Sequence, residues 1–236
     1  MSKPIAWSWS RLSMFEQCPK RFWGNNVGKV FPKPNFEAAH FKKGKAVHKV
    51  LEDYLRDGTK IPFPVPEING PETFSVKLDF LMPLLDKMRK ANTVLPELQV
   101  TFDIRMHEVS WFDKKAWCRV VLDALIIVGD FALVIDWKTG KVKQHSDQLK
   151  LFAGAVLSKY KKVNRVLTAY VWCEHENTSP TYAEYSRKDM EAIWQDFGDR
   201  QELIQMCNES GNWPAKPNHL CGWCEAREDQ CEHKST

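Results

Sequence analysis

The sequence predicts an α/β protein in which helices flank a mixed central β-sheet. Segments with helical spacing of apolar residues precede and follow the middle of the chain, and polar and apolar residues alternate with a period of two through much of that middle region. The predicted order is helices, a three-strand meander, a helix, a strand and a helix. We therefore expect the helices to cover the faces of the sheet.

Composition is that of a globular chain, with 236 residues, of which 43% are hydrophobic and 27% are charged. No apolar run approaches the roughly 18 residues of a membrane span, and the first residues lack the apolar core of a signal peptide. We therefore expect a single cytoplasmic domain over residues 1–236. The net charge of +4 permits an anionic partner without requiring one.

Several helices are expected before the strands. Ser10 is a candidate N-cap for a short helix, and residues 44–56 have the apolar spacing of a second helix. Residues 57–72 are rich in proline and glycine and predict a loop. A further helix over about 73–91 is expected to break or kink at Pro83.

Strands are predicted from alternation, beginning with a half-buried strand over residues 98–106. Two more follow near 117–128 and 131–138. The remaining predicted elements are a helix over 145–159, a strand over 165–173 and a long helix capped by Ser186 that ends near 209.

The turn between the second and third strands predicts their register. Gly129-Asp130 suits a two-residue type II′ turn, because glycine occupies its first central position. Val128 then pairs with Phe131, and the pairing continues outward from there. A bulge or a longer turn would shift this register by one residue and send side chains to the opposite face.

This register brings charged side chains together within apolar strands. Asp123 lies opposite Asp136, at a Cβ separation of about 4.5–5.5 Å, and Lys138 points the same way as Asp136. Two such carboxylates do not both ionise without a cation between them. One alternative is an Asp–Lys salt bridge with a second Asp at a strand end. A divalent metal, which binds carboxylate oxygens, water and substrate phosphates, explains both acids.

An acid in one strand followed by Asp-x-Lys in the next resembles the catalytic core of the PD-(D/E)XK nucleases. The resemblance implies a restriction-endonuclease-like core over about residues 40–185, with Mg²⁺ or Mn²⁺ bound by Asp123 and Asp136. It also implies that the backbone carbonyl of Trp137 completes the coordination and that Lys138 positions the attacking water.

Three further residues extend the resemblance to the RecB-like branch. Gly44 and His48 match a helix that begins Gly-x-x-x-His, which implies a histidine metal ligand and makes Mn²⁺ a better fit. Gln148 matches Gln-x-x-x-Tyr and would orient the catalytic lysine or the DNA phosphates, although Phe152 replaces the tyrosine. Glu97 is a loose match to a supporting acid. The alternatives are an ordinary helix histidine, a surface glutamine and an exposed glutamate at a strand entrance.

The cysteines suggest a second inorganic site. An odd count of seven in a reducing compartment argues against a disulfide framework. Cys221, Cys224 and Cys231 form C-x₂-C-x₆-C, a chelating pattern that lacks a fourth cysteine nearby. His233 would complete a zinc site, and Cys18 would complete a set of thiolates. The other cysteines lie on apolar faces and are expected in the core, namely Cys118, Cys173 and Cys207.

The segment around Cys18 resembles the N-terminus of RecB-like nucleases of the AddB and CRISPR-associated exonuclease type. Their pattern Ser-x-Leu-x-x-Phe-x-x-Cys-Pro is reproduced by Ser10, Leu12, Phe15, Cys18 and Pro19. The resemblance implies that Cys18 joins the C-terminal trio to hold a [4Fe–4S] cluster, which normally takes four thiolates. Such a cluster would join segments 8–25 and 212–233. The x₆ gap is slightly longer than is common, and zinc remains the alternative.

Together these motifs predict a metal-dependent DNA nuclease. Family resemblance implies exonuclease activity on single-stranded DNA or DNA ends, in recombination, repair or DNA degradation. Trp23 is a candidate for stacking on unpaired bases. Clustered lysines would follow the phosphates, or form an ordinary solvated surface; they are Lys29, Lys33, Lys42, Lys43 and Lys45, then Lys138, Lys141 and Lys143, then Lys159, Lys161 and Lys162.

Other functions remain open from sequence alone. No G-x₄-G-K-[ST] motif is present, so we expect any helicase or recombination protein to be a separate partner. The rivals are an endonuclease or junction resolvase of the same superfamily, and a non-catalytic DNA-binding protein stabilised by zinc or a cluster.

Overall fold

The computed structural model describes residues 5–33, 38–142 and 147–234. Lys143 and the first residues of the helix predicted from residue 145 lie outside these ranges. Within them, no helix is long and apolar enough to cross a membrane. The residue contacts divide the chain into two compact units, which comprise 36–100 with 120–194, and 1–35 with 101–119 and 195–236.

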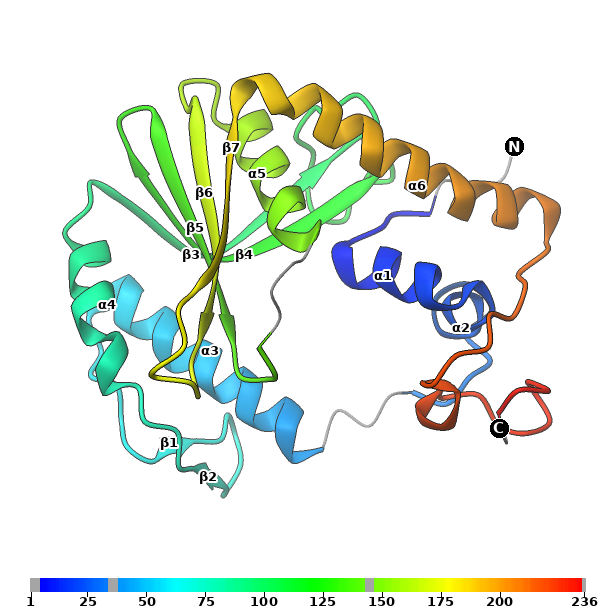
Figure 1. The fold of residues 1–236 in the computed structure, drawn as a ribbon, viewed down its shortest axis with the longest axis horizontal. Helices are drawn as coiled ribbons and strands as arrows, with labels where there is room; N and C mark the ends of the chain where they lie inside the picture. Colours follow the sequence, from blue (N-terminus) through cyan, green and yellow to red (C-terminus); the bar gives the residue numbers. More distant parts are fainter. Residues whose placement is uncertain (1–4, 34–37, 143–146, 235–236) are drawn as a thin grey trace. The chain divides into compact units, whose positions relative to one another are not determined.

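A mixed five-stranded sheet with strand order β3-β4-β5-β6-β7 forms the centre of the fold (Figure 1). Its strands are β3 (Thr93–Phe102), β4 (Cys118–Val128), β5 (Phe131–Lys138), β6 (Arg165–Trp172) and β7 (Thr181–Ser186). β4 and β5 are antiparallel, β5 and β6 are parallel, and β6 and β7 are antiparallel. The predicted mixed sheet flanked by helices is therefore confirmed.

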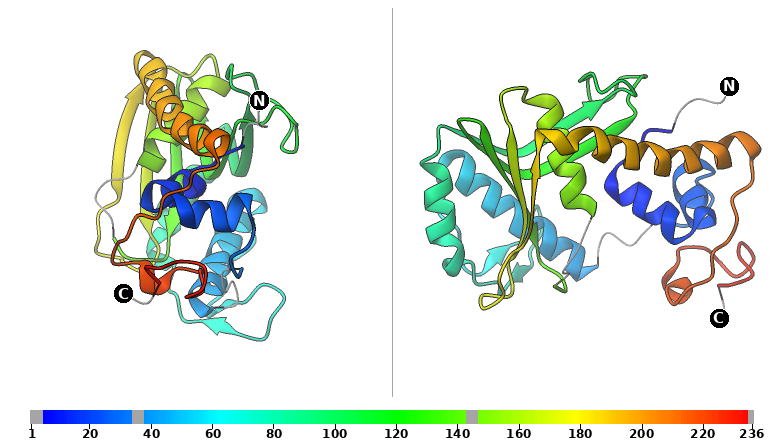
Figure 2. Two further views of the ribbon diagram at one scale, coloured as in Figure 1. Left: turned by 90° about the vertical axis from the view of Figure 1, so that its right-hand side faces the viewer. Right: turned by 45° about the horizontal axis from the view of Figure 1, so that its top comes forward.

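Helices cover both faces of this sheet (Figures 1 and 2). α3 (Ala39–Asp57) and α4 (Met82–Arg89) lie on one face, and α5 (Asp147–Lys159) lies on the other, within the crossover from β5 to β6. The apolar stripe of α3 predicted this packing. Its buried side chains share one hydrophobic core with α4 and with inward-facing strand residues, among them Val47, Leu51, Leu85, Ile126 and Ile135.

The hairpin between β4 and β5 has the register predicted from its turn. Val128 pairs with Phe131, and the ladder continues in step to Ala124 and Ile135. Gly129 has φ 61°, a left-handed conformation that glycine adopts without steric cost. The predicted type of turn therefore set the correct register for the two strands that carry the acids.

The predicted strand over 98–106 is displaced toward the N-terminus, because the chain turns after β3. The Asp103 carboxylate accepts the backbone N–H groups of Arg105 and His107 at 2.8 and 2.9 Å. This local hydrogen bonding competes with strand pairing, so the alternation beyond Asp103 continues in a turn and leaves Ile104 71% exposed.

The helix predicted over 73–91 is also wrong in its first half. A short strand β2 (Thr73–Phe74) pairs with β1 (Val65–Pro66), and a 3₁₀ turn η2 (Asp79–Leu81) leads into α4. Pro83 lies in the first turn of α4 rather than at a kink. Proline is tolerated there because the N–H groups of the first turn have no hydrogen-bond partner within the helix, so the helix does not kink.

The N-terminal helix α1 (Trp9–Gln17) begins after Ser8, so the prediction that Ser10 caps it was wrong by two residues. Ser186 is the predicted cap and forms a capping box at η3 (Arg187–Asp189), which leads into α6 (Met190–Ser210). The short remaining elements are α2 (Pro19–Phe22), the π-helical turn η1 (Trp23–Val27) and the 3₁₀ turn η4 (Cys221–Trp223).

Candidate active site

The side chains predicted to be catalytic gather at one end of the sheet, within the unit formed by residues 36–100 and 120–194. His48 comes from α3, Asp123 from β4, Asp136 and Lys138 from the end of β5, and Gln148 from the first turn of α5. Helices on the two faces thus supply groups to the same strand ends. The described contacts separate these groups into two sets, one around Asp123 and one around Asp136.

His48, Glu97 and Asp123 form the first set. The Nδ1 atom of His48 lies 3.3 Å from Asp123 Oδ2 and 3.9 Å from Glu97 Oε1. One ligand atom from each residue lies within 4.8 Å of the other two. Two carboxylates and one imidazole are a suitable donor set for Mg²⁺ or Mn²⁺, and the imidazole favours the latter.

The backbone of Trp137 organises this set. Its carbonyl oxygen lies 2.8 Å from Nε2 of His48, and its N–H donates to Asp123 Oδ2 at 2.8 Å. Because a carbonyl can only accept, Nε2 carries the hydrogen and Nδ1 is directed to the acids. Such an outer hydrogen bond commonly orients a metal-binding histidine. The predicted metal-binding carbonyl is therefore a hydrogen-bond acceptor for His48 in the metal-free chain.

The hydrogen bond from the N–H of Trp137 to Asp123 also explains where the β4–β5 ladder ends. Its last pair is Ala124 with Ile135, one residue before the two acids. At the next step the Asp123 side chain takes the N–H of Trp137. The predicted Asp123–Asp136 pair is therefore the step just beyond the last pair of the ladder. The two carboxylates make separate contacts, Asp123 with the N–H of Trp137 and Asp136 with Lys138.

The electrostatics of the first set favour a positive charge beside the acids. Burial lowers the pKa of His48, but the hydrogen bond to Asp123 and the charges of Asp123, Asp136 and Glu97 outweigh it and raise that pKa to about 9. Burial and the charge of Asp123 raise the pKa of Glu97. The protonated imidazole of His48 supplies positive charge beside these acids, a role that a divalent metal would take over.

Glu97 is closer to the centre of the site than its sequence position indicated. It lies within β3 instead of before it, and its φ of 50° is in the left-handed region. A non-glycine residue rarely adopts this conformation, and such strain clusters at functional sites. The alternative of an exposed glutamate at a strand entrance does not describe this half-buried residue beside His48.

Asp136 belongs to the second set and is only 4% exposed. The ammonium group of Lys138 contacts its Oδ2, and Gln148 Nε2 donates to its Oδ1 at 3.0 Å. Lys138 also donates to Gln148 Oε1 at 3.3 Å. Burial and the charge of Asp123 raise the pKa of Asp136 to about 7, against the opposing effect of Lys138.

Tyr170 completes the second set and was missed by the sequence analysis. Its hydroxyl donates to Gln148 Oε1 at 2.9 Å, and Lys138 Nζ lies 4.6 Å from the centre of its ring. Tyr170 stands beside Asp136 in the parallel β5–β6 register. Phe152, which replaces the tyrosine of the sequence motif, is buried. The hydroxyl that bonds Gln148 therefore comes from a neighbouring strand.

A groove of about 690 Å³ opens over the first set. Both polar and apolar side chains line it, among them Phe41, Lys45, His48, Ile68, Glu97 and Lys138. The groove gives a substrate access to His48 and Glu97 of the first set and to the lysine of the second set.

Comparison with known proteins identifies the family. A model of the PD-(D/E)XK nuclease superfamily matches residues 6–231. The chain belongs to the PD-(D/E)XK nuclease superfamily. This superfamily member is 30% identical over 90 residues to an ATP-dependent helicase/nuclease subunit from Carboxydothermus hydrogenoformans, a match that covers 33% of the chain and 8% of that relative. The chain thus spans only a small part of the relative's length.

The fold of this superfamily member is also similar to a solved structure. The crystal structure of SSO0001 superposes with a TM-score of 0.50 at 14% sequence identity, covering 100% of this chain and 90% of the other. At that identity the similarity concerns the fold alone.

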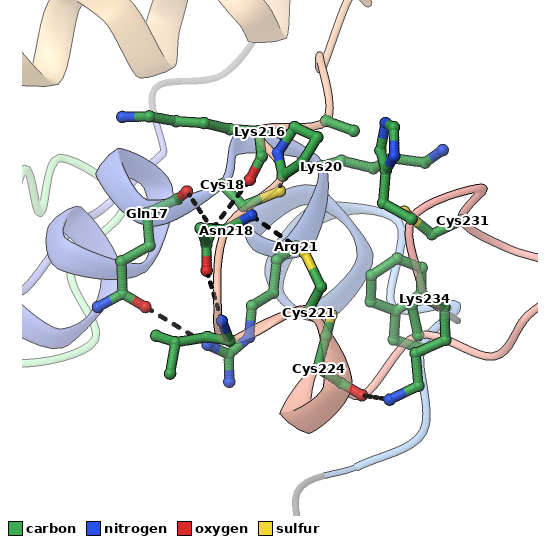
Figure 3. A pocket seen from close by; sticks show the side chains of 16 residues that line it. Gln17, Cys18, Lys20, Arg21, Lys216, Asn218, Cys221, Cys224, Cys231 and Lys234 are labelled. Atoms are coloured by element: carbon green, nitrogen blue, oxygen red, sulfur yellow. Dashed lines mark hydrogen bonds between the residues drawn. The ribbon is translucent and has the colours of Figure 1, made fainter. Parts of the chain in front are cut away.

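The unit formed by residues 1–35, 101–119 and 195–236 holds the cysteine motif of this superfamily member. One pocket is lined by Cys18, Cys221, Cys224 and Cys231, all half-buried free thiols (Figure 3). The backbone N–H groups of Lys216 and Asn218 lie 3.4 and 3.3 Å from the sulfur atoms of Cys18 and Cys221. His233 lines the same pocket. Of the other cysteines, Cys118 and Cys173 are buried as predicted, whereas Cys207 is half-buried.

Four cysteines at one pocket, with His233 beside them, offer ligands for either a [4Fe–4S] cluster or a zinc ion.

Proposed function

We propose that this chain is a metal-dependent DNA nuclease that acts as an exonuclease on single-stranded DNA or DNA ends. The observation that carries the proposal is the adjacency of two sets at one end of the sheet. His48, Glu97 and Asp123 form a group of metal-ligand type, and Asp136 holds Lys138 beside it. A plain salt bridge between Asp136 and Lys138 would not account for the first set.

His48, Asp123 and Asp136 would hold Mg²⁺ or Mn²⁺, with Glu97 as a further ligand and the carbonyl of Trp137 at the edge of the site. The donor set fits because an imidazole and two carboxylates, those of His48, Glu97 and Asp123, present ligand atoms within 4.8 Å of one another. When bound, such a metal polarises the phosphate and promotes ionisation of a water molecule.

The residues of the second set position the attacking water and stabilise charge on the phosphate. Lys138 is held by the Asp136 carboxylate, the Gln148 amide oxygen and the face of the Tyr170 ring. These contacts fix the ammonium group beside the acids. A fixed cation stabilises the charge that develops on a phosphate during attack without reorganising at that moment.

We further propose that Cys18, Cys221, Cys224 and Cys231 bind a [4Fe–4S] cluster. Their shared pocket and the backbone N–H groups directed at two of the sulfurs support this assignment, and zinc with His233 as the fourth ligand is the second candidate. The cluster would join the two ends of the chain, segments 8–25 and 212–233.

The relative named as a helicase/nuclease subunit suggests how the nuclease is used. We propose that the chain acts in the cytoplasm on DNA prepared by a separate helicase or recombination protein, in recombination, repair or DNA degradation. Strand separation would supply the single-stranded substrate.

A cleavage assay in Mn²⁺ tests the proposal, with linear and closed circular single-stranded DNA as parallel substrates. We expect the wild type to degrade the linear strand and leave the circle intact. Asp136→Ala and Lys138→Ala should each lower the rate by at least about a hundredfold, while Lys60→Ala, which removes an exposed ammonium group outside the groove and the lysine clusters, should have no effect. Cleavage of the circle would show an endonuclease, and undiminished activity of both site variants would place the chemistry elsewhere.

A further inference from the structure

The groove over the metal-ligand group has aromatic and apolar side chains exposed along its edge. Phe41 is 40% exposed and Ile68 is 43% exposed, and both line the same groove as His48 and Glu97. Neither residue belongs to the hydrophobic core that α3 shares with the sheet. Exposed apolar side chains beside a catalytic groove commonly mark a place where a ligand binds.

An ion pair connects the two segments that carry these side chains. Lys42 Nζ lies 3.0 Å from Glu67 Oε1, which links the first turn of α3 to the loop between β1 and β2. Both side chains of this pair are mostly buried, and Lys42 lowers the pKa of Glu67. Phe41 and Ile68 are the sequence neighbours of this pair, so the pair links the two backbone segments from which they project.

The first turn of α3 also presents a second ring. The His40 and Phe41 ring centres lie 4.2 Å apart, with their planes inclined by 38°. Both residues are exposed and both line the groove. Two adjacent rings and the Ile68 side chain thus expose aromatic and apolar surface in one groove, and aromatic side chains of this kind stack on nucleobases.

We propose that His40, Phe41 and Ile68 form a platform on which an unpaired base of the substrate strand stacks, so that the site prefers single strands and frayed ends to intact duplex. The inference rests on the proposed nuclease function and names the substrate feature that this site recognises. A base within a duplex already stacks on its neighbours and cannot occupy the platform without unpairing.

Charges in the groove agree with this placement. Lys45 and Lys138 line it and supply positive charge for the phosphates on either side of the stacked base. Lys49 is engaged with Asp53 at 2.7 Å. The acids remain available for the metal, while the platform receives the apolar part of the nucleotide.

Trp23 was predicted from the sequence to stack on unpaired bases, but its ring packs against the protein itself. Its ring packs so closely on Gly28 that a Cβ atom at that glycine would lie 2.8 Å from it. Trp23 is half-buried in this packing. The platform therefore assigns base stacking to the residues at the active-site groove instead.

Steady-state cleavage of a single-stranded oligonucleotide in Mn²⁺ tests the platform. Phe41→Ala and Ile68→Ala should raise KM, by at least about fivefold for Phe41, which corresponds to the lower end of base–aromatic stacking. Phe41→Trp should keep the wild-type KM. A strand with abasic sites should be cleaved equally by wild type and Phe41→Ala, because it has no base to stack.

Controls separate this inference from the proposed function. Phe112→Ala removes another exposed ring, 87% exposed, and should leave KM unchanged. The Mn²⁺ affinity of Phe41→Ala, measured by calorimetry, should equal that of the wild type. A changed affinity would mean that the variant acts through the metal ligands, and it would overturn the platform. If the wild type cleaves DNA but Phe41→Ala has an unaltered KM, the platform is wrong and the nuclease stands. If the wild type cleaves no DNA, the proposed function itself fails.

Discussion

Two cations balance the acids at the level of single residues. The imidazolium of His48 faces Asp123 and Glu97, and the ammonium group of Lys138 contacts Asp136. The two differ in kind, because an imidazole can lose its proton and become a metal ligand, whereas the Lys138 side chain is a hydrogen-bond donor to Asp136 and Gln148. A metal would therefore replace the positive charge of His48, whereas Lys138 would remain beside Asp136 for catalysis.

Metal affinity should therefore depend on pH. The pKa of His48 is raised to about 9 in the metal-free chain, so a metal must displace a proton from its Nδ1 atom at neutral pH. Protonation opposes binding, and the Mn²⁺ affinity should rise by about tenfold per pH unit between pH 7 and pH 8.5. Calorimetric titration measures it. His48→Gln, which has no proton to lose, should bind more weakly and with a shallower pH dependence, and an equally steep slope would contradict this role.

Tyr170 should act as a positioning residue. Tyr170→Phe removes only the hydroxyl that donates to Gln148 Oε1, so the amide that holds Asp136 and Lys138 becomes less constrained. We expect kcat to fall by about three- to tenfold, the worth of one net hydrogen bond, with KM and Mn²⁺ affinity unchanged. Tyr182→Phe is the matched control, because Tyr182 is 71% exposed on β7. A kcat equal to that of the wild type would exclude the role.

At the level of secondary structure, the sequence predicted the pairing of strands joined by a short turn but not the pairing of strands joined by a long connection. The Gly129-Asp130 turn predicted the β4–β5 register, because in a two-residue hairpin the turn fixes every pair. Tyr170 could not be found this way, since the parallel β5–β6 pairing is joined through a helix and no short turn fixes its register. β7 escaped prediction for another reason. As an edge strand without a fully buried face, it lacks the apolar alternation that marks a strand.

The capping box before α6 gives a test at this scale. Asp189 Oδ2 accepts from both the backbone N–H and the hydroxyl of Ser186, at 2.7 and 2.8 Å. Ser186→Ala should lower the free energy of unfolding by about 1 kcal/mol, measured by urea denaturation, with kcat unchanged. Ser186→Thr keeps a hydroxyl and should lose much less. Equal unfolding midpoints for Ser186→Ala and the wild type would show that this cap contributes nothing.

At the level of the whole molecule, the order of motifs along the sequence predicted the superfamily better than any one motif did. The site residues lie far apart in the sequence, and only the fold brings them together; in order they are His48, Asp123, Asp136, Lys138 and Gln148. The interleaving of the two compact units was not predictable, because residues 101–119 group with both chain ends and no local signal encodes such distant contacts.

The cysteine pocket can be tested on the whole chain. Protein purified without oxygen should be coloured and contain about four iron and four sulfide ions per chain. Cys18→Ser should lose most of the iron and lower the Tm, because one of the four ligands is gone. Cys207→Ser changes a half-buried cysteine outside the pocket and should retain the cluster. Colourless protein with one zinc per chain would overturn the iron–sulfur assignment and leave the nuclease site unaffected.

The most direct test of the central claim is to locate the metal itself. Crystals soaked in Mn²⁺ can be measured at a wavelength where manganese scatters anomalously. We predict an anomalous peak in contact with Nδ1 of His48 and with the carboxylates of Asp123, Asp136 and Glu97, and we expect this peak to be lost in crystals of Asp123→Asn. A peak elsewhere in the protein, with none at these side chains, would contradict this claim.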